Sequence, residues 1–162
     1  MDRLWAPWRL DYAAQPKAPV DAGCFVCRAA AANDREHLVV YQTEQIVVIL
    51  NRYPYNNGHL LVCPRAHKAD PHELTDGETL ELQRILQRMM AALQTTIKPD
   101  GFNVGLNLGR AAGAGVPGHL HWHVVPRWSG DVNFMPVLAD TKVIVQSLES
   151  LHEILSRELS GR

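Results

Sequence analysis

The chain has few cysteines, no excess of either charge and no long hydrophobic run. Its 162 residues include three cysteines, 16 Lys and Arg, and 17 Asp and Glu, which gives a net charge of −1. Binding a long nucleic acid usually requires a basic surface, so nucleic acid is not expected as a partner, whereas small phosphorylated ligands are not excluded. No apolar run approaches the length of a membrane span, so no membrane partner is expected either.

The absence of a long apolar run and the small number of cysteines also indicate the compartment of the protein and the state of its thiols. The start, MDRLWAPWRL, lacks the long apolar stretch of a signal peptide, which makes the cytoplasm the expected compartment. In that compartment three cysteines indicate reduced thiols or a metal site before disulfides. The length suits one domain with a buried core, and the chain has no internal repeat or low-complexity linker. We expect a single domain over 1–162, with an N-terminal arm at 1–23, a core at about 24–136 and a C-terminal helix at about 141–159.

Hydrophobic periodicity predicts the elements of this domain. Four strands are expected, at 45–50, 59–63, 102–108 and 119–125, the first two joined as a hairpin with a long loop. Two amphipathic helices are expected, one near 77–97 with Thr75 or Asp76 as its cap and one at about 141–159. Strands and helices without regular βαβ alternation favour an α+β fold, mainly an antiparallel sheet with two main helices.

The segment GHLHWHVVPR, residues 118–127, places a histidine at every second position. Alternate side chains of a strand share a face, so His119, His121 and His123 are expected on one face and hydrophobic residues on the other. At ~3.3 Å per residue the outer two Cα atoms would lie roughly 13 Å apart, too far to share one ion through bonds of ~2 Å. Separate roles fit this row better than a single metal cage or a solvated strand face.

A glycine-rich stretch, NLGRAAGAGVPG, comes directly before the histidines. It has four glycines and no β-branched residue before Val116, so its backbone N–H groups can approach an anion closely. It is not a P-loop, because no G-K-[ST] follows and a strand comes next. Alone, the stretch is either a flexible loop or a phosphate cradle. Its position beside the histidines indicates a phosphate held against an imidazole.

Cys24 and Cys27 form a C-x-x-C pair, which is one half of a zinc site in many proteins. The alternatives are a redox pair, for which the βαβ context is missing, or two unrelated small residues. Zinc needs two further ligands, and the residues alone leave four histidines open: His37, His59, His67 and His119. Three other residues are expected to be structural or solvated: Cys63 in the core, and His72 and His152 at the surface.

The histidine pattern and its surroundings resemble the histidine triad (HIT) family. The segment His119-Leu-His121-Trp-His123-Val-Val matches the family signature H-φ-H-φ-H-φ-φ. ILNRYPYNNGHLLVCPRAHKADPHEL is similar to the family's earlier hairpin. HVVPRWSGDVNFMP is similar to the Fhit-like branch, which cleaves diadenosine polyphosphates and includes bacterial phosphorylases. The likeness covers roughly residues 20–140, the RLWAPWR start also resembles bacterial members, and the resemblance implies a HIT-like fold in a homodimer.

The resemblance implies nucleotidyl transfer through a covalent nucleotidyl-histidine. His121 would attack the α-phosphorus, because a neutral imidazole has a free nitrogen and a backbone carbonyl can fix its tautomer. His123 would contact phosphate oxygens and the leaving group. The implied nucleotide contacts are Asn51 at the ribose, His59 and Asn107 at the phosphates, and the backbone of Gly113, Gly115 and Val116. Without the resemblance, Asn51 is equally well a turn residue, Asn107 a polar group at a sheet end and His59 a structural group.

The resemblance also implies the missing metal ligands. Zinc-bearing relatives, among them the larger galactose-1-phosphate uridylyltransferases, combine a cysteine pair with the histidines that correspond to His67 and His119. Cys24, Cys27, His67 and His119 would then close a tetrahedral site around a structural zinc. Magnesium is the second metal compatible with the implied function, as a companion of the substrate phosphates.

One stretch departs from the family pattern. Many members carry Gln-Ser or Gln-Thr three to four residues before the first triad histidine, where this chain has Gly115 and Val116 and one extra loop residue. Either backbone N–H groups substitute for the missing amide and hydroxyl, or the leaving-group specificity differs. The acceptor, phosphate or water, therefore stays open. So do three rival functions: a regulatory nucleotide-binding module with little turnover, a hydrolase of another adenosine nucleotide ester or phosphoramidate, and a metal-dependent hydrolase with His119 and His121 as ligands.

Overall fold

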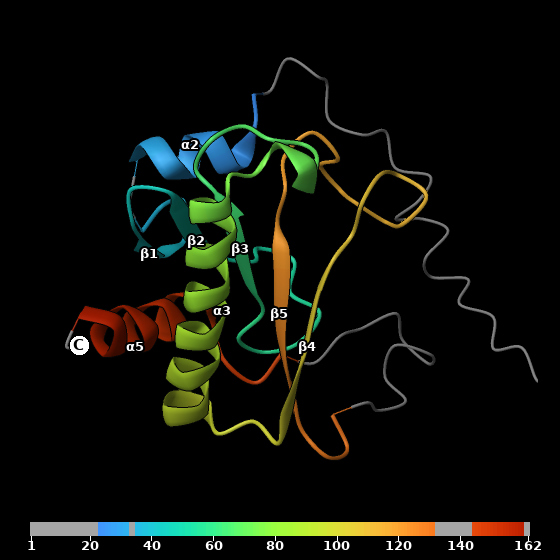
Figure 1. Ribbon diagram of the computed structural model, residues 1–162. Helices are drawn as coiled ribbons and strands as arrows, with labels where there is room; N and C mark the ends of the chain where they lie inside the picture. The colour runs from blue at the N-terminus through green and yellow to red at the C-terminus, as the bar shows by residue number, and fades with distance from the viewer. Residues whose placement is uncertain (1–22, 33–34, 132–143, 161–162) are drawn as a thin grey trace, which may run out of the picture.

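The computed structural model describes residues 23–32, 35–131 and 144–160, and its core is a five-stranded antiparallel sheet flanked by helices (Figure 1). The strand order is β1-β2-β3-β5-β4. The strands are β1 (Val39–Gln42), β2 (Ile46–Leu50), β3 (Leu60–Pro64), β4 (Gly101–Leu106) and β5 (Trp122–Arg127). The helices are α2 (Phe25–Ala32), α3 (Asp76–Ile97) and α5 (Leu148–Ser160), with a 3₁₀ turn, η2, at Pro71–Glu73. The predicted α+β fold with an antiparallel sheet is confirmed.

Helix α3 lies across β2, β3 and β5 and covers one face of the sheet (Figure 1). It begins after Thr75, because Thr75 and Glu78 form a capping box in which each side chain accepts from the other residue's backbone N–H. It ends where Lys98 turns into the left-handed region. The apolar side chains that it buries are Leu82, Ile85, Leu86, Met89, Ala92 and Leu93. Each large apolar side chain so buried stabilises the fold by about 1.5–3 kcal/mol.

Several expected boundaries are wrong. Helix α5 begins at Leu148 rather than near 141; residues 144–147 are not helical, and 141–143 lie outside the described residues, as does the arm over 1–22. The pattern analysis missed β1 and α2, because four and eight residues are too few to show a period. His152 is not solvated: α5 packs against β1, and the buried His152 ring donates from Nε2 to the Val39 carbonyl at 2.7 Å. His72 is exposed and Cys63 is buried, as expected.

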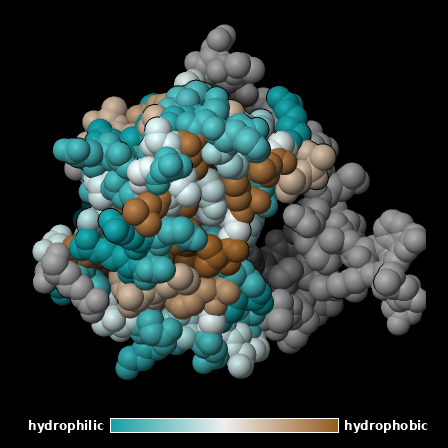
Figure 2. Space-filling model, viewed as in Figure 1, coloured by the Kyte–Doolittle hydropathy of each residue, from teal (hydrophilic) through white to brown (hydrophobic). Residues whose placement is uncertain are grey.

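The two faces of β5 have different tasks. Pro126 lies with Leu93 and Ile97 of α3 around Gly58, so the face with Trp122, Val124 and Pro126 belongs to the α3 layer. His123 lies on the opposite face with its register partners, Leu61 of β3 and Gly105 of β4. The α3 side of the molecule has a largely hydrophilic exterior with scattered apolar groups (Figure 2). In the part of the chain that the structure describes, no helix has the length and apolar character needed to cross a membrane.

Gly58 is required where the β2–β3 loop returns to the sheet. Its φ is +76°, and an added Cβ would lie 2.7 Å from Ile97 Cδ1 and 3.1 Å from both Leu93 and Pro126. We expect Gly58→Ala to lower the free energy of unfolding by about 1–3 kcal/mol through backbone strain and overpacking, as measured by urea unfolding. Gly101→Ala is the control, since no described atom lies within 4 Å of its added Cβ. Equal losses in both variants would contradict the assignment.

Candidate functional site

The first two triad histidines precede the regular part of β5, which begins at Trp122. Two bonds hold this segment against the end of β3 and the residues after it. His119 Nε2 donates to the Pro64 carbonyl at 2.8 Å, and the Leu120 N–H donates to the Lys68 carbonyl at 2.7 Å. These two hydrogen bonds take the place of the strand-to-strand hydrogen bonds that a regular β-strand would make at these positions. The expectation that all three histidines share one regular strand face is therefore wrong.

The surroundings of His121 fix its tautomer. Its Nδ1 lies 2.7 Å from the His119 carbonyl oxygen, which can only accept a hydrogen bond. Nδ1 therefore carries the proton, and Nε2 of the neutral ring keeps a free electron pair. The His121 side chain is buried, and its ring contacts the His123 ring with the centroids 5.2 Å apart. A nucleophilic imidazole requires this arrangement.

A second chain of hydrogen bonds orients His123. The Tyr55 N–H donates to His59 Nδ1 at 3.0 Å, so the proton of neutral His59 is on Nε2. His59 Nε2 lies 2.9 Å from His123 Nδ1 and donates to it. His123 therefore accepts through Nδ1 and carries its own proton on Nε2. His59 was expected at the phosphates; in the structure it contacts His123, and this contact makes His123 Nε2 a hydrogen-bond donor.

Burial and the neighbouring His121 lower the pKa of His123 to about 4. Burial also lowers the pKa of His119, with smaller contributions from His67 and His121. Burial disfavours the charged imidazolium, and a second cation nearby adds repulsion. His123 is therefore neutral at pH 7 and keeps the single Nε2 proton that its hydrogen bonds select.

Two asparagines border this pair of rings. Asn107 Nδ2 lies 3.5 Å from His123 Nε2, so its amide stands beside the nitrogen that carries the His123 proton. Asn51 Oδ1 accepts from the Tyr53 N–H at 3.0 Å, and Asn51 Nδ2 lies 3.2 Å from His59 Nδ1. Asn51 thus shapes the β2–β3 loop in this structure, as a turn residue would. Its role toward a ribose stays a prediction.

One of the three backbone N–H groups expected to bind an anion already makes a hydrogen bond within the glycine-rich loop. The Gly113 N–H donates to the Arg110 carbonyl at 3.0 Å, in a turn where Gly113 has a φ of +88°. The N–H groups of Gly115 and Val116 have no partner among the described residues. Of the three expected backbone contacts, Gly115 and Val116 are therefore the ones able to donate to an anion without rearrangement.

Cys24, Cys27, His67 and His119 bring four ligand atoms within 4.8 Å of one another, and this group could hold a metal ion. His119 Nδ1 lies 3.2 Å from Cys24 Sγ and 3.2 Å from His67 Nδ1, and Cys27 Sγ lies 3.3 Å from His67 Nδ1. Tetrahedral zinc with bonds of 2.0–2.3 Å separates its ligand atoms by roughly 3.3–3.8 Å, so the donor set fits. Of the four histidines left open by the residues alone, the structure selects His67 and His119.

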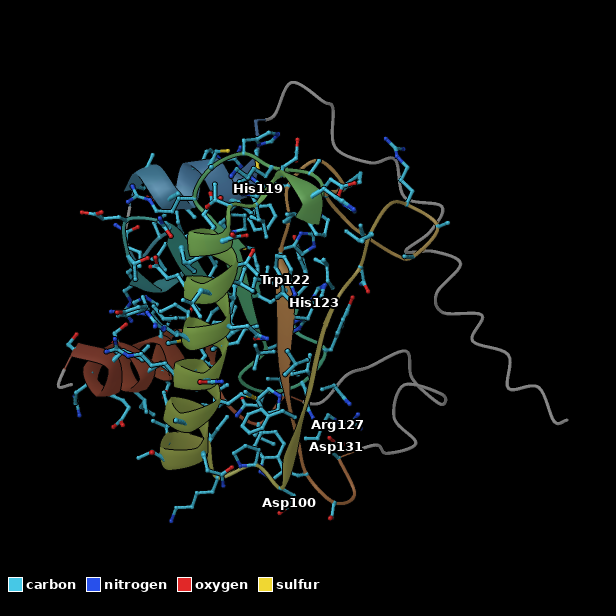
Figure 3. The ribbon with its side chains drawn as sticks, in the orientation of Figure 1. Asp100, His119, Trp122, His123, Arg127 and Asp131 are labelled. Atoms are coloured by element: carbon cyan, nitrogen blue, oxygen red, sulfur yellow. The ribbon has the colours of Figure 1, made fainter. Side chains whose placement is uncertain are left out.

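The other end of β5 has a structural task. Figure 3 shows Trp122, His123 and Arg127 in order along β5, with His119 before the strand and Asp131 beside Arg127. Arg127 Nε donates to Asp131 Oδ2 at 2.6 Å, and this bond holds the pKa of Asp131 down at about 2. Trp128 Nε1 donates to the Lys98 carbonyl at 3.2 Å, so Trp128 closes the end of α3.

Two further residues contribute to the site, Tyr55 and Glu78, and neither was expected from the histidine pattern. The Tyr55 ring stacks on His123 with the centroids 5.6 Å apart, and the aromatic YPY run was its one visible signal. Glu78 was visible as part of the T-x-x-E capping pattern, but its bond to Lys68, at 2.6 Å, joins segments that no local pattern connects.

Together, the antiparallel sheet, the paired histidines with fixed tautomers and the Cys₂His₂ ligand set define a class of small α+β proteins built around a histidine site. The HIT domain model matches residues 32–130, which is more than half of the chain. The chain belongs to the histidine triad (HIT) family, as its histidine pattern predicted.

Individual relatives extend the likeness over most of the chain. The "AP-4-A phosphorylase" of Mycobacterium tuberculosis is 39% identical and covers 98% of this chain and 84% of its own length. A Zn-bound histidine triad family protein from Mycobacterium smegmatis aligns with a TM-score of 0.69 at 26% identity, covering 86% of this chain and 94% of that one. A histidine triad nucleotide-binding protein from Sulfolobus tokodaii aligns with a TM-score of 0.68 at 28% identity, covering 85% and 93%.

The low pKa of His123 predicts how stability depends on pH. Its folded value of about 4 lies below the usual ~6.5, so the unfolded chain takes up the proton first as the pH falls. The stability from neutral His123 is complete above about pH 6.5 and is lost toward pH 4. Between about pH 7.5 and about pH 5, we expect the wild type to lose about 1–2 kcal/mol more unfolding free energy than His123→Asn. Parallel losses in urea titrations of the two proteins would disprove the shift.

Proposed function

We propose that this protein cleaves a dinucleoside polyphosphate, such as diadenosine tetraphosphate, at an α-phosphate and transfers the nucleotidyl group to inorganic phosphate. The observation that carries the proposal is the pair of opposite tautomers: His121 has a free Nε2, and neighbouring His123 has a protonated Nε2. A nucleophile and a hydrogen-bond donor thus stand side by side. The 39% identity to a protein named AP-4-A phosphorylase supports phosphate as the acceptor.

The reaction follows in two displacements. His121 Nε2 attacks the α-phosphorus, so a P–N bond forms while the bond to the bridging oxygen breaks and ATP leaves. The Nε2–H of His123 donates to the departing oxygen, and the His119 carbonyl accepts from Nδ1 of the ring that becomes cationic. A phosphate oxygen then attacks the same phosphorus from the side that ATP has left. The P–N bond breaks, ADP is released, and His121 regains its free nitrogen.

The remaining site residues would bind and orient the nucleotide. Asn107, beside His123 Nε2, would donate to an α-phosphate oxygen. The N–H groups of Gly115 and Val116, which have no partner among the described residues, would donate to the phosphate oxygens that the usual Gln-Ser or Gln-Thr pair binds in other members. Gly113 would shape the turn. Asn51 would contact the ribose through its second lone pair. His59 acts through His123, whose proton it positions. Positioning and charge stabilisation dominate such transfers.

Zinc would have a structural role in the Cys24, Cys27, His67 and His119 group. Two thiolates and two neutral imidazoles are ligands that zinc prefers, and they leave no position open for water. When bound, the ion ties α2 to the end of β3 and to the histidine segment. His121 is not a member of this group and uses Nδ1 for the His119 carbonyl, which argues against a metal-dependent hydrolase with His119 and His121 as ligands. A Zn-bound relative supports zinc as the ion.

The homodimer, the cytoplasmic location and a magnesium ion on the substrate phosphates stay predictions. Strand β4 is an edge strand with exposed Asn103, Val104 and Gly105, which is compatible with a partner strand from a second copy.

The acceptor and the nucleophile are tested together. Purified protein is incubated with diadenosine tetraphosphate, with and without inorganic phosphate, and the nucleotides are separated by chromatography. We expect ADP plus ATP in the presence of phosphate only, and a loss of about a thousandfold in turnover for His121→Asn, which has no nucleophilic nitrogen. His72→Asn, at an exposed position of η2 and outside the metal-ligand group, is the matched control and should keep wild-type turnover.

Each of the other outcomes would indicate a different function for this protein. AMP plus ATP in both tubes would mean a hydrolase. Equal turnover of His121→Asn and wild type would rule out the covalent intermediate. Tight nucleotide binding without turnover would favour the regulatory binding module, and no response to this substrate would favour another adenosine ester or phosphoramidate.

Removing the metal tests its structural role. We expect a strong chelator or Cys27→Ser to lower the melting temperature and the activity together, because zinc binding is coupled to folding. Bound zinc is measured by elemental analysis and unfolding by calorimetry. Cys63→Ala removes the buried third thiol, which lies outside the ligand group, and should retain zinc. Loss of activity at an unchanged melting temperature would instead indicate a catalytic ion.

A further inference from the structure

We propose that Lys68 is a positioning residue for both the metal site and the nucleophile, and that Glu78 holds Lys68 in place. The metal and the reaction are those of the proposed function, on which this inference rests. Lys68 touches neither substrate nor metal. It joins the first turn of α3 to the segment that carries His67 and, through its backbone, to the segment that carries His119 and His121.

The side-chain half of this link is a partly buried ion pair. Lys68 Nζ lies 2.7 Å from Glu78 Oε1 and 2.6 Å from Oε2, and the two side chains are only 19% and 11% exposed. Glu78 Oε2 also accepts from the Thr75 N–H at 2.7 Å and the Thr75 hydroxyl at 2.9 Å. The carboxylate is therefore fixed on the rigid start of α3, and it offers the ammonium group one well-defined position.

The backbone half of the link reaches the active segment. The Lys68 carbonyl accepts from the Leu120 N–H at 2.7 Å, and Leu120 lies between the metal ligand His119 and the nucleophile His121. Lys68 also directly follows the ligand His67. A displacement of this one residue therefore moves a ligand on one side and the triad backbone on the other.

Beside the contacts of Lys68, the N–H groups of Ala69 and Asp70 donate to Glu73 Oε2 at 2.6 and 2.9 Å, which joins the run 66–70 to the adjacent η2 turn. Residues 66–70 have no regular secondary structure, and Lys68 is the one member of this run that is not exposed. His67 itself is exposed, so packing does not fix its position. When a residue that orients a metal ligand is removed, metal affinity or activity typically falls by about 10–100-fold. The Lys68–Glu78 pair has the geometry for such a role.

Lys68→Met and Glu78→Gln test the pair from both sides. The carbonyl oxygen of glutamine can keep the capping interaction with Thr75, while the substitution removes the charge and replaces one of the two oxygens that accept from Lys68 by an NH2 donor. Zinc affinity is measured on folded protein by competition with a chromophoric chelator, and kcat and KM are measured with diadenosine tetraphosphate and phosphate. We expect zinc to bind about 10–100-fold more weakly, kcat to fall and both KM values to stay unchanged. Arg35→Gln, which breaks an ion pair with side chains 56% and 57% exposed, is the control and should change neither quantity.

Conservative and reciprocal variants separate positioning from general stabilisation. Lys68→Arg should retain most of the zinc affinity and kcat, and the exchange Lys68→Glu with Glu78→Lys should recover part of what each single charge reversal loses. If Lys68→Met does not fold, Glu78→Asp, which shortens the carboxylate arm by one methylene, tests the same expectation on a smaller scale. A lower melting temperature with wild-type zinc affinity and kcat would overturn the proposal, as would a wild-type protein that binds no zinc. Failure of wild type to turn over the substrate would refute the proposed function, while the zinc titration would still decide on Lys68.

Discussion

The hydrogen bond from His119 Nε2 to the Pro64 carbonyl is the interaction on which both sites depend. It places the ring proton on Nε2, which leaves Nδ1 facing Cys24 and His67 for a metal. It also holds the His119 backbone, whose carbonyl accepts from His121 Nδ1 and so frees the opposite nitrogen of that ring. His119 therefore contributes its side chain to the candidate metal site and its main-chain carbonyl to the proposed nucleophile, His121. A change in either site reaches the other through one residue.

The tautomers of His121, His59 and His123 are set in the same way, by a backbone group at the end of a chain of hydrogen bonds. For His121 the deciding group is a carbonyl; for His59 and His123 it is the Tyr55 N–H. Buried polar networks stabilise a unique arrangement only when each member has a partner. Here burial lowers the pKa of His123 to about 4, so His123 is neutral at pH 7 and keeps the proton arrangement that the Tyr55 N–H selects.

The sequence predicted the parts of this arrangement that depend on local pattern. The alternating histidines, the start of α3 at Thr75 and the α+β class follow from spacing and capping residues, and the likeness to the HIT family named His67 and His119 as ligands. The errors have a common cause. His119 and His121 lie outside the strand, because the carbonyls of Pro64 and Lys68 accept hydrogen bonds from this segment. His152 is buried and not at the surface, because it donates to the Val39 carbonyl. All three carbonyls belong to residues far away in the sequence. Local periodicity contains no information about such partners.

The ligand group joins the beginning of the domain to its last strand, since Cys24 and His119 are 95 residues apart. Closing a loop of that size in an unfolded chain costs roughly 4–5 kcal/mol in chain entropy, so an ion that bridges the two ends disfavours the unfolded state by a similar amount. During synthesis the two cysteines leave the ribosome long before the fourth ligand does. A chain that ends between His67 and His119 therefore has three of the four candidate ligands and lacks the histidine segment that follows. The four-ligand group is complete only in a chain that already reaches the segment of His121, the proposed nucleophile.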